Sequence, residues 1–187
     1  MKEFCYSGMQ AVEHMLYQAT LDTSACAILL PTEIAKRFPF PFQKFHEDEF
    51  TTYKYYLSAT HVAVTTKSVY FYLQRKGSIM HTFGQASLDE LEAADHLVEF
   101  CESNYPSLVA AANSKKFSDY CQVLLSTSKI KSYPVVYERI IKYLSQYKWR
   151  QIMDKKVRNK NKSAALLLVL GGSKLLTLVD RIVNKNG

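Results

Sequence analysis

The residues best suited to chemistry are His46 and the three carboxylates that follow it, Glu47, Asp48 and Glu49. The run follows an aromatic segment, residues 37–42, in which two prolines exclude a regular helix. Apolar residues then recur at helical spacing, so we expect a helix over 47–60 with Asp48 near its start. The N–H groups and the dipole of a helix start favour an ionised carboxylate, which can act as a general base beside a pocket. The same pattern fits the acidic first turn of an ordinary solvated helix.

A second informative segment, VYFYLQRKGSIM at residues 69–80, lies one helix length downstream. Phe-Pro, Glu-Asp-Glu, a helix, a strand, Tyr-x-Tyr and Ser-Ile occur in this order and spacing. This ordered set resembles the C-terminal half of bacterial family-2 glycosyltransferases of the GT-A fold. Residues 7–16 also look like the helix that precedes this region in polysaccharide-type members. The resemblance covers about residues 7–158 and is strongest over 31–81.

The resemblance implies roles for several of these side chains in an inverting sugar transfer. Asp48 would be the general base that takes the proton of the acceptor hydroxyl, and Glu47 would orient the loop or touch the acceptor. Arg75 and Ser78 would lie near the nucleotide diphosphate, where a guanidinium can bind phosphate oxygens. An ordinary surface arginine in a basic loop is the other interpretation of Arg75. Glu49 has no implied role, and we expect it to be a solvated charge.

Two histidines, His46 and His81, are further candidates for a metal or phosphate contact. His46-Glu47 has no second histidine at helical spacing, so the zincin motif is absent, and polar surface is the plainer interpretation of both. The chain also departs from the family pattern at two places. Leu73 stands where relatives often carry an arginine, and residues 26–30 lack the Trp and Lys that relatives tend to have there.

The donor side of a GT-A enzyme is not legible in this sequence. There is no Asp-x-Asp, no parallel βαβ alternation before residue 31, and no phosphate-binding glycine loop among the six glycines. We therefore expect a separate half to hold the nucleotide-sugar donor and a divalent metal, Mg or Mn. We expect no metal and weak nucleotide-sugar binding for this chain alone. The acceptor would be a glycan or a lipid-linked sugar.

The expected fold is α+β and predominantly helical, with a small two-strand element near residues 61–73. Residues 1–86 would form the acceptor-side part of the catalytic domain, and residues 87–187 a helical C-terminal region. The predicted strands are 61–65 and 68–73. Capping residues, prolines and apolar periodicity predict helices over 8–19, 32–36, 47–60, 88–103, 106–125, from 134 onward, and 163–183 with an interruption at the paired glycines 171–172.

Positive charge is concentrated in the last third of the chain. Residues 129–187 carry fourteen Lys/Arg against three Asp/Glu, within a net charge of +7. The stretch 148–187 combines this charge with leucines, and its apolar runs are far shorter than the ~20 residues of a membrane span. It fits a helix on an anionic membrane surface, or a helix that packs against the domain or a second subunit. A non-enzymatic module that docks through this tail is the alternative function.

The remaining composition bounds the compartment and the partners. The four cysteines form no C-x-x-C pair, and no signal peptide is legible in residues 1–20, so we expect a cytoplasmic location, peripheral on the inner face of the membrane. Nucleic acid is a weak candidate partner, because the basic run has few interleaved aromatics and no nucleic-acid motif.

Overall fold

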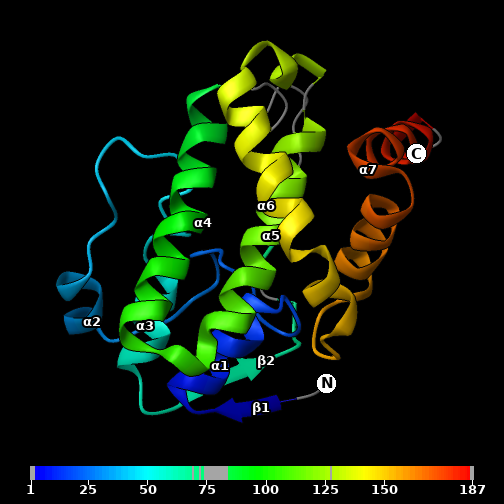
Figure 1. The fold of residues 1–187 in the computed structure, drawn as a ribbon. Coiled ribbons are helices and arrows are strands. Elements are labelled where there is room, and N and C mark those ends of the chain that lie inside the picture. The colour runs from blue at the N-terminus through cyan, green and yellow to red at the C-terminus, as the bar shows by residue number, and fades with distance from the viewer. Residues whose placement is uncertain (1–2, 69, 72, 74–83, 127, 186–187) are drawn as a thin grey trace.

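The computed structural model describes residues 3–68, 70, 71, 73, 84–126 and 128–185. The predicted α+β, predominantly helical fold class is confirmed (Figure 1). In chain order the elements are β1 (Glu3–Tyr6), α1 (Gly8–Leu16), α2 (Thr32–Arg37), α3 (Thr52–Ser58), β2 (Val62–Thr65), α4 (Gln85–Asn104), the 3-10 turn η2 (Pro106–Leu108), α5 (Val109–Ser126), the 3-10 turn η3 (Ser128–Ser132), α6 (Pro134–Met153) and α7 (Asn159–Lys185).

The two-stranded sheet pairs distant parts of the chain. β2 coincides with the predicted strand 61–65, but its antiparallel partner is β1, with Glu3 opposite Thr65 and Tyr6 opposite Val62. The predicted second strand, 68–73, was wrong for the residues of that range that the structure describes. Those residues are exposed and adopt no strand, with Phe71 91% exposed, so they bury no apolar face that would reward pairing.

Two helix starts follow features that the sequence offers, and a third does not. Ser7 caps α1 through a capping box with Gln10, in which each backbone N–H is bound by the other side chain at 3.3 and 2.9 Å. Pro134 opens α6 as expected. The helix predicted from residue 88 begins earlier, at Gln85, so Ser87 is buried within its first turn and does not cap it.

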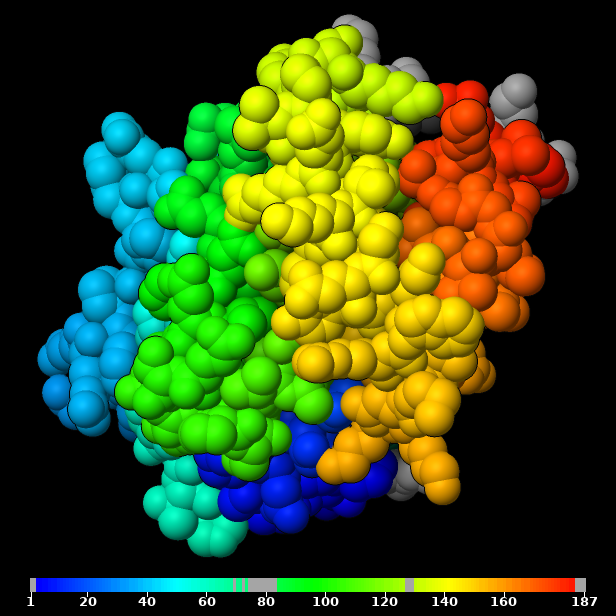
Figure 2. Space-filling view, in the orientation of Figure 1, coloured from blue at the N-terminus to red at the C-terminus, as the bar shows by residue number. Residues whose placement is uncertain are grey.

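The core has two apolar clusters stacked along the helices. The first lies among α1, α3, the end of α4 and the start of α5, and it also takes in Val157 from the α6–α7 corner. The second lies among the start of α4, the end of α5, α6 and α7. The first cluster draws side chains from both sides of the expected domain boundary between residues 86 and 87. That boundary stays a prediction. Figure 2 shows α4 and α6 side by side on one face, with α7 along its edge.

The last helix is broken at Gly171-Gly172, as the paired glycines predicted. Gly172 has φ +62° and ψ −160°, a conformation that is essentially restricted to glycine. The break divides α7 into two segments that point in different directions (Figure 1). Among the described residues, no helix combines the length and the apolar character needed to cross a membrane.

Candidate functional site

The acidic run lies on an irregular loop between α2 and α3. The prediction of a loop over 38–46 is confirmed, but the helix expected from residue 47 begins only at Thr52. His46 has a positive φ of 55°, and residues 47–50 form turns in which the Asp48 carbonyl accepts the N–H groups of Thr51 and Thr52 at 3.0 and 2.8 Å. The Asp48 carboxylate also binds the backbone N–H of Glu49, a local contact that competes with helix formation. Asp48 therefore precedes the helix and is not part of its first turn.

The Asp48 side chain is half-buried and keeps one oxygen available. Its Oδ1 accepts the Glu49 N–H at 2.9 Å, and Oδ2 has no hydrogen-bond partner within the described ranges. Burial, followed by the charges of Glu49 and Glu47, raises the pKa of Asp48, while that N–H bond and His46 oppose the rise. The sequence had suggested that a helix start would favour the ionised form. That expectation was wrong, because the helix begins four residues later and burial dominates.

Glu49, expected to be solvated, is instead part of a buried ion cluster. Its Oε1 accepts a hydrogen bond from the Lys115 ammonium at 2.8 Å, and Lys115 also contacts Asp119 Oδ1 at 2.6 Å. Lys115 is only 2% exposed. Burial alone would lower the pKa of Lys115, but the charges of Asp119 and Glu49 and the hydrogen bonds to both raise it. A fully buried ammonium thus fixes Glu49, the direct neighbour of Asp48.

Burial affects two carboxyls at this cluster, its member Asp119 on α5 and the nearby Glu90 on α4. Burial, followed by the charge of Glu49, raises the pKa of Asp119 to about 7, against the pull of Lys115. Burial, followed by the charges of Asp119 and Glu49, raises the pKa of Glu90 to about 9, so Glu90 is neutral at physiological pH. The second oxygen of Asp119, Oδ2, is buried without a hydrogen-bond partner among the described residues. A neutral Glu90 lessens the excess of negative charge around Lys115.

The beginning of the loop is attached to α4. The Lys44 ammonium lies 3.1 Å from Asp89 Oδ1 and 2.7 Å from Glu92 Oε2, and the backbone N–H of Phe45 binds Asp89 Oδ2 at 3.0 Å. Burial opposes ionisation of Asp89, but the hydrogen bonds from Phe45, Gln85 and Lys44 lower its pKa overall. The acidic loop is therefore held at both ends, by Asp89 on α4 and by Lys115 on α5.

The remaining sequence-predicted residues fall into two groups. His46 Nε2 lies 3.9 Å from Glu90 Oε2, so His46 contacts α4, and Glu47 is exposed at the surface. Arg75, Ser78 and His81 lie outside the described residues. The structure thus brings His46 to α4 and Glu49 to α5, and Asp48 lies between these two residues in the loop.

The structure also has two hollows, and the acidic run lines neither of them. A groove of about 730 Å³ runs between the segment 20–34, α3 and β2, with Tyr55, Tyr56 and His61 among its polar lining. A smaller hollow of about 130 Å³ lies where α5, α6 and the second segment of α7 meet. Asp48 lines neither of them. In the described part of the chain, no three His, Cys, Asp or Glu side chains are grouped so that they could hold a metal ion.

Sequence reasoning missed the buried charges of α4 and α5. The signal was present in α5, where Lys115 and Asp119 continue a series with Leu108 and Ala112 at helical spacing. That series is the buried face of the helix, so a charged pair on it implies a partner from another element.

No family model, curated protein or solved structure matches this chain.

Proposed function

We propose that this chain forms the acceptor side of an inverting glycosyltransferase, with Asp48 as the general base. One observation carries the proposal: Asp48 has an available carboxylate oxygen and a raised pKa, on a loop that buried ion pairs attach to two helices. The ordered motifs that resemble family-2 enzymes support the same assignment. Base catalysis needs a carboxylate of raised basicity held in one place, and a loop fixed by Lys115 and Asp89 meets that need.

In the proposed reaction, the acceptor oxygen forms a bond to the anomeric carbon of the donor sugar. The bond between that carbon and the nucleotide diphosphate breaks, and the diphosphate leaves with the electron pair. The hydroxyl proton moves to Asp48 Oδ2, so the step is balanced without an oxidant or reductant. Since Asp48 lines neither hollow, the acceptor would reach it from the molecular surface. Glu47, exposed beside it, would contact the acceptor or orient the loop.

Donor binding is assigned to a separate half and to a segment beyond the described residues. A divalent metal, held by that other half, would neutralise the leaving diphosphate. Arg75 and Ser78 would contact the diphosphate, and His46 and His81 stay candidates for polar contacts to substrate. The acceptor class is a glycan or a lipid-linked sugar.

Four free thiols, two of them exposed, fit a reducing compartment, and we infer a cytoplasmic location on this basis.

The test is sugar transfer by the gene product that carries this chain, supplied with a donor-binding GT-A half. Nucleotide release from a panel of nucleotide sugars is measured with glycan and lipid-linked acceptors. Asp48→Asn should lower kcat by roughly 10²–10⁴-fold, the usual contribution of a positioned general base. Glu33→Gln is the matched control, since this carboxylate is 84% exposed and lies on α2, outside the acidic loop. Unchanged transfer by Asp48→Asn, with an unaltered melting temperature, removes Asp48 from the base role.

The alternative function is a non-enzymatic module that docks through its basic C-terminal tail. The observation that favours it is the row of exposed apolar side chains on α7. Absence of both nucleotide release and glycan binding by the wild-type chain, together with membrane docking by α7, would favour this alternative over the transferase.

A further inference from the structure

We propose that α7 docks on the surface of an anionic membrane. Its outer apolar side chains would enter the boundary of the acyl chains, and its Lys and Arg side chains would meet the lipid phosphates. The apolar docking face consists of Leu166, Leu170, Leu178 and Ile182. This inference does not depend on sugar transfer, and it holds or fails separately from the role of Asp48.

The apolar docking face is uncovered along both segments of the helix. The exposed fractions are 50% for Leu166, 70% for Leu170, 55% for Leu178 and 54% for Ile182. These side chains are large aliphatics that a folded chain ordinarily buries when it has a partner surface for them. The opposite side of the same helix is well packed, with its residues in the second core cluster. Figure 2 shows α7 at the outer edge of the molecule, beside α6.

Positive charge accompanies the apolar residues on the second segment. Lys174, Leu178 and Ile182 follow one another at intervals of four residues, so they share one side of the helix, and Arg181 lies beside them. Lys174 and Arg181 are exposed. Asp180 is the only acidic residue in the sequence from 159 to 187. An aliphatic strip bordered by cations is the pattern of a helix that lies in a membrane interface.

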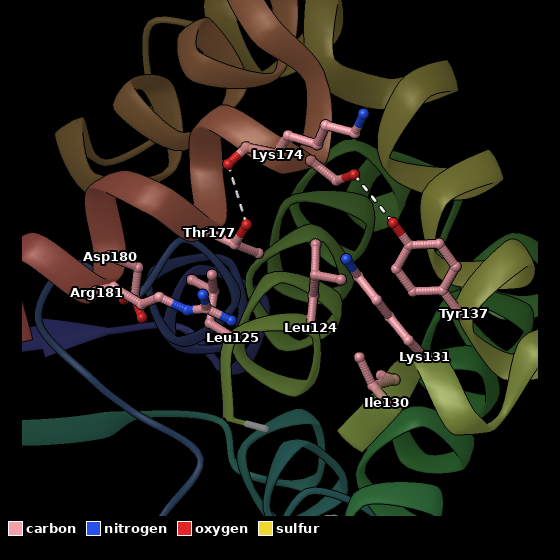
Figure 3. A pocket seen from close by; sticks show the side chains of 10 residues that line it. Leu124, Leu125, Ile130, Lys131, Tyr137, Lys174, Thr177, Asp180 and Arg181 are labelled. Carbon is pink, nitrogen blue, oxygen red and sulfur yellow. Dashed lines mark hydrogen bonds between the residues drawn. The ribbon is translucent and has the colours of Figure 1, made fainter. Parts of the chain in front are cut away.

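The small hollow between α5, α6 and the second segment of α7 would take a phosphate close to the apolar docking face. Lys131, Lys174 and Arg181 line it together with the hydroxyls of Tyr137, Ser173 and Thr177, and Asp180 is its acidic member. Figure 3 shows the Lys131 ammonium and the Arg181 guanidinium pointing toward the middle of the hollow from opposite sides. Two cations that point into one hollow, with Lys174 on its rim, suit the phosphate of a lipid headgroup that lies beside the apolar docking face.

Charge decides between a membrane and the other occupants of such a face. A second copy of this chain would bring the same Lys and Arg side chains opposite these ones, and like charges across an interface are unfavourable. A nucleic acid would match the charge but would leave the exposed leucines in water. An anionic bilayer matches both the charge and the apolar strip. The break at Gly172 leaves two short segments, each well below the ~20 residues of a membrane span, so the helix would lie along the surface.

Flotation of the whole chain with lipid vesicles tests the proposal. The vesicles contain phosphatidylcholine alone or with about 30% phosphatidylglycerol, at low salt and at a concentration that shortens the Debye length to about 3 Å. We expect binding to anionic vesicles only, weakened at high salt. Leu178→Asp with Ile182→Asp should lower the partition coefficient roughly tenfold or more, because it removes apolar contact and adds negative charge. Lys174→Gln with Arg181→Gln should lower it by a similar factor.

The matched control places the same change on an unrelated exposed surface. Leu29 and Phe42 are 101% and 88% exposed, so Leu29→Asp with Phe42→Asp adds the same charge and removes more exposed apolar surface than the test variant does. This control should float as the wild type does. Three results would overturn the proposal: equal binding to neutral vesicles, equal loss of binding in the control variant, and a dimer that dissociates in Leu178→Asp/Ile182→Asp while no variant floats. Binding to duplex DNA that is indifferent to Leu178 and Ile182, without flotation, would assign the face to nucleic acid.

Discussion

Replacing Lys115 by methionine should be among the most destabilising single changes to this chain. The side chain is 2% exposed, and its ammonium is the only cation within 3 Å of Glu49 and Asp119 in the described part of the chain. Methionine keeps the length and the apolar stem of lysine but removes the charge. Two carboxylates that are 14% and 4% exposed then lose their partner. The change isolates the ion cluster from the packing around it.

The size of the effect follows from burial. Removing one member of a buried ion pair costs about 3–5 kcal/mol, because the remaining charge is left unpaired. Asp119 already has its pKa raised to about 7, so it can take up a proton near neutral pH and limit that cost. We therefore expect the lower end, about 3 kcal/mol, which corresponds to a fall in melting temperature of roughly 6–12 °C for a domain of this size. The loss should shrink at lower pH, where the Asp119 carboxyl is protonated.

Urea unfolding followed by circular dichroism measures this free energy, with equal m-values as the check that the transition is comparable. Lys36→Met is the control, since Lys36 is 69% exposed and lies 3.5 Å from Glu33. That pair should contribute about 0.5 kcal/mol or less. If Lys115→Met destabilises the chain no more than Lys36→Met does, the ion cluster does not hold the acidic loop, and the argument for a fixed Asp48 fails with it.

The free energy of unfolding should fall as the pH rises from about 5 to 9. The pKa of Glu90 in the folded chain is raised to about 9, above its ordinary value near 4.5. Over that range the folded chain therefore binds one proton more than the unfolded chain does. Glu90→Gln should flatten this slope in urea titrations at several pH values; an unchanged slope would exclude Glu90 as its source. Thiol labelling at neutral pH should modify Cys5 and Cys26, which are exposed, within minutes. Cys101 and Cys121, buried and with pKa values raised to about 11 and about 12, should react only after unfolding, and rapid labelling of all four would contradict the packing of α4 and α5.

Local chemistry made much of the helical fold predictable. Ser7 with Gln10, Pro134 and the glycine pair at 171–172 fix helix starts and a break through backbone geometry alone, and the structure has all three. The strand pairing was less accessible. β1 is four residues long, and its partner lies about sixty residues later, so no short turn motif in the sequence indicates that the two strands pair.

The candidate site shows the same division between local and long-range information. Asp48 could be singled out from its neighbours and from the family resemblance, because its motif is contiguous. The roles of Glu49, Glu90 and Lys115 depend on three elements meeting, and each residue alone looks like surface charge in the sequence. The late start of α3 has the same origin, since Glu49 turns toward Lys115 and Asp48 binds its neighbour's backbone. Tertiary contacts override helix propensity at this point.

The contact between the α6–α7 corner and the N-terminal helix bears on how the chain is synthesised. The Tyr17 hydroxyl donates to Asp154 at 2.6 Å, across 137 residues, and Val157 completes the first apolar cluster. Translation at about 5–20 residues per second puts roughly 7–30 s between the emergence of these two partners. During that interval the first apolar cluster, which α3, α4 and α5 already share with α1, lacks Val157. Production of this protein in a foreign host should therefore benefit from slower initiation, lower temperature or extra chaperone, each of which protects a nascent chain until its closing residues arrive.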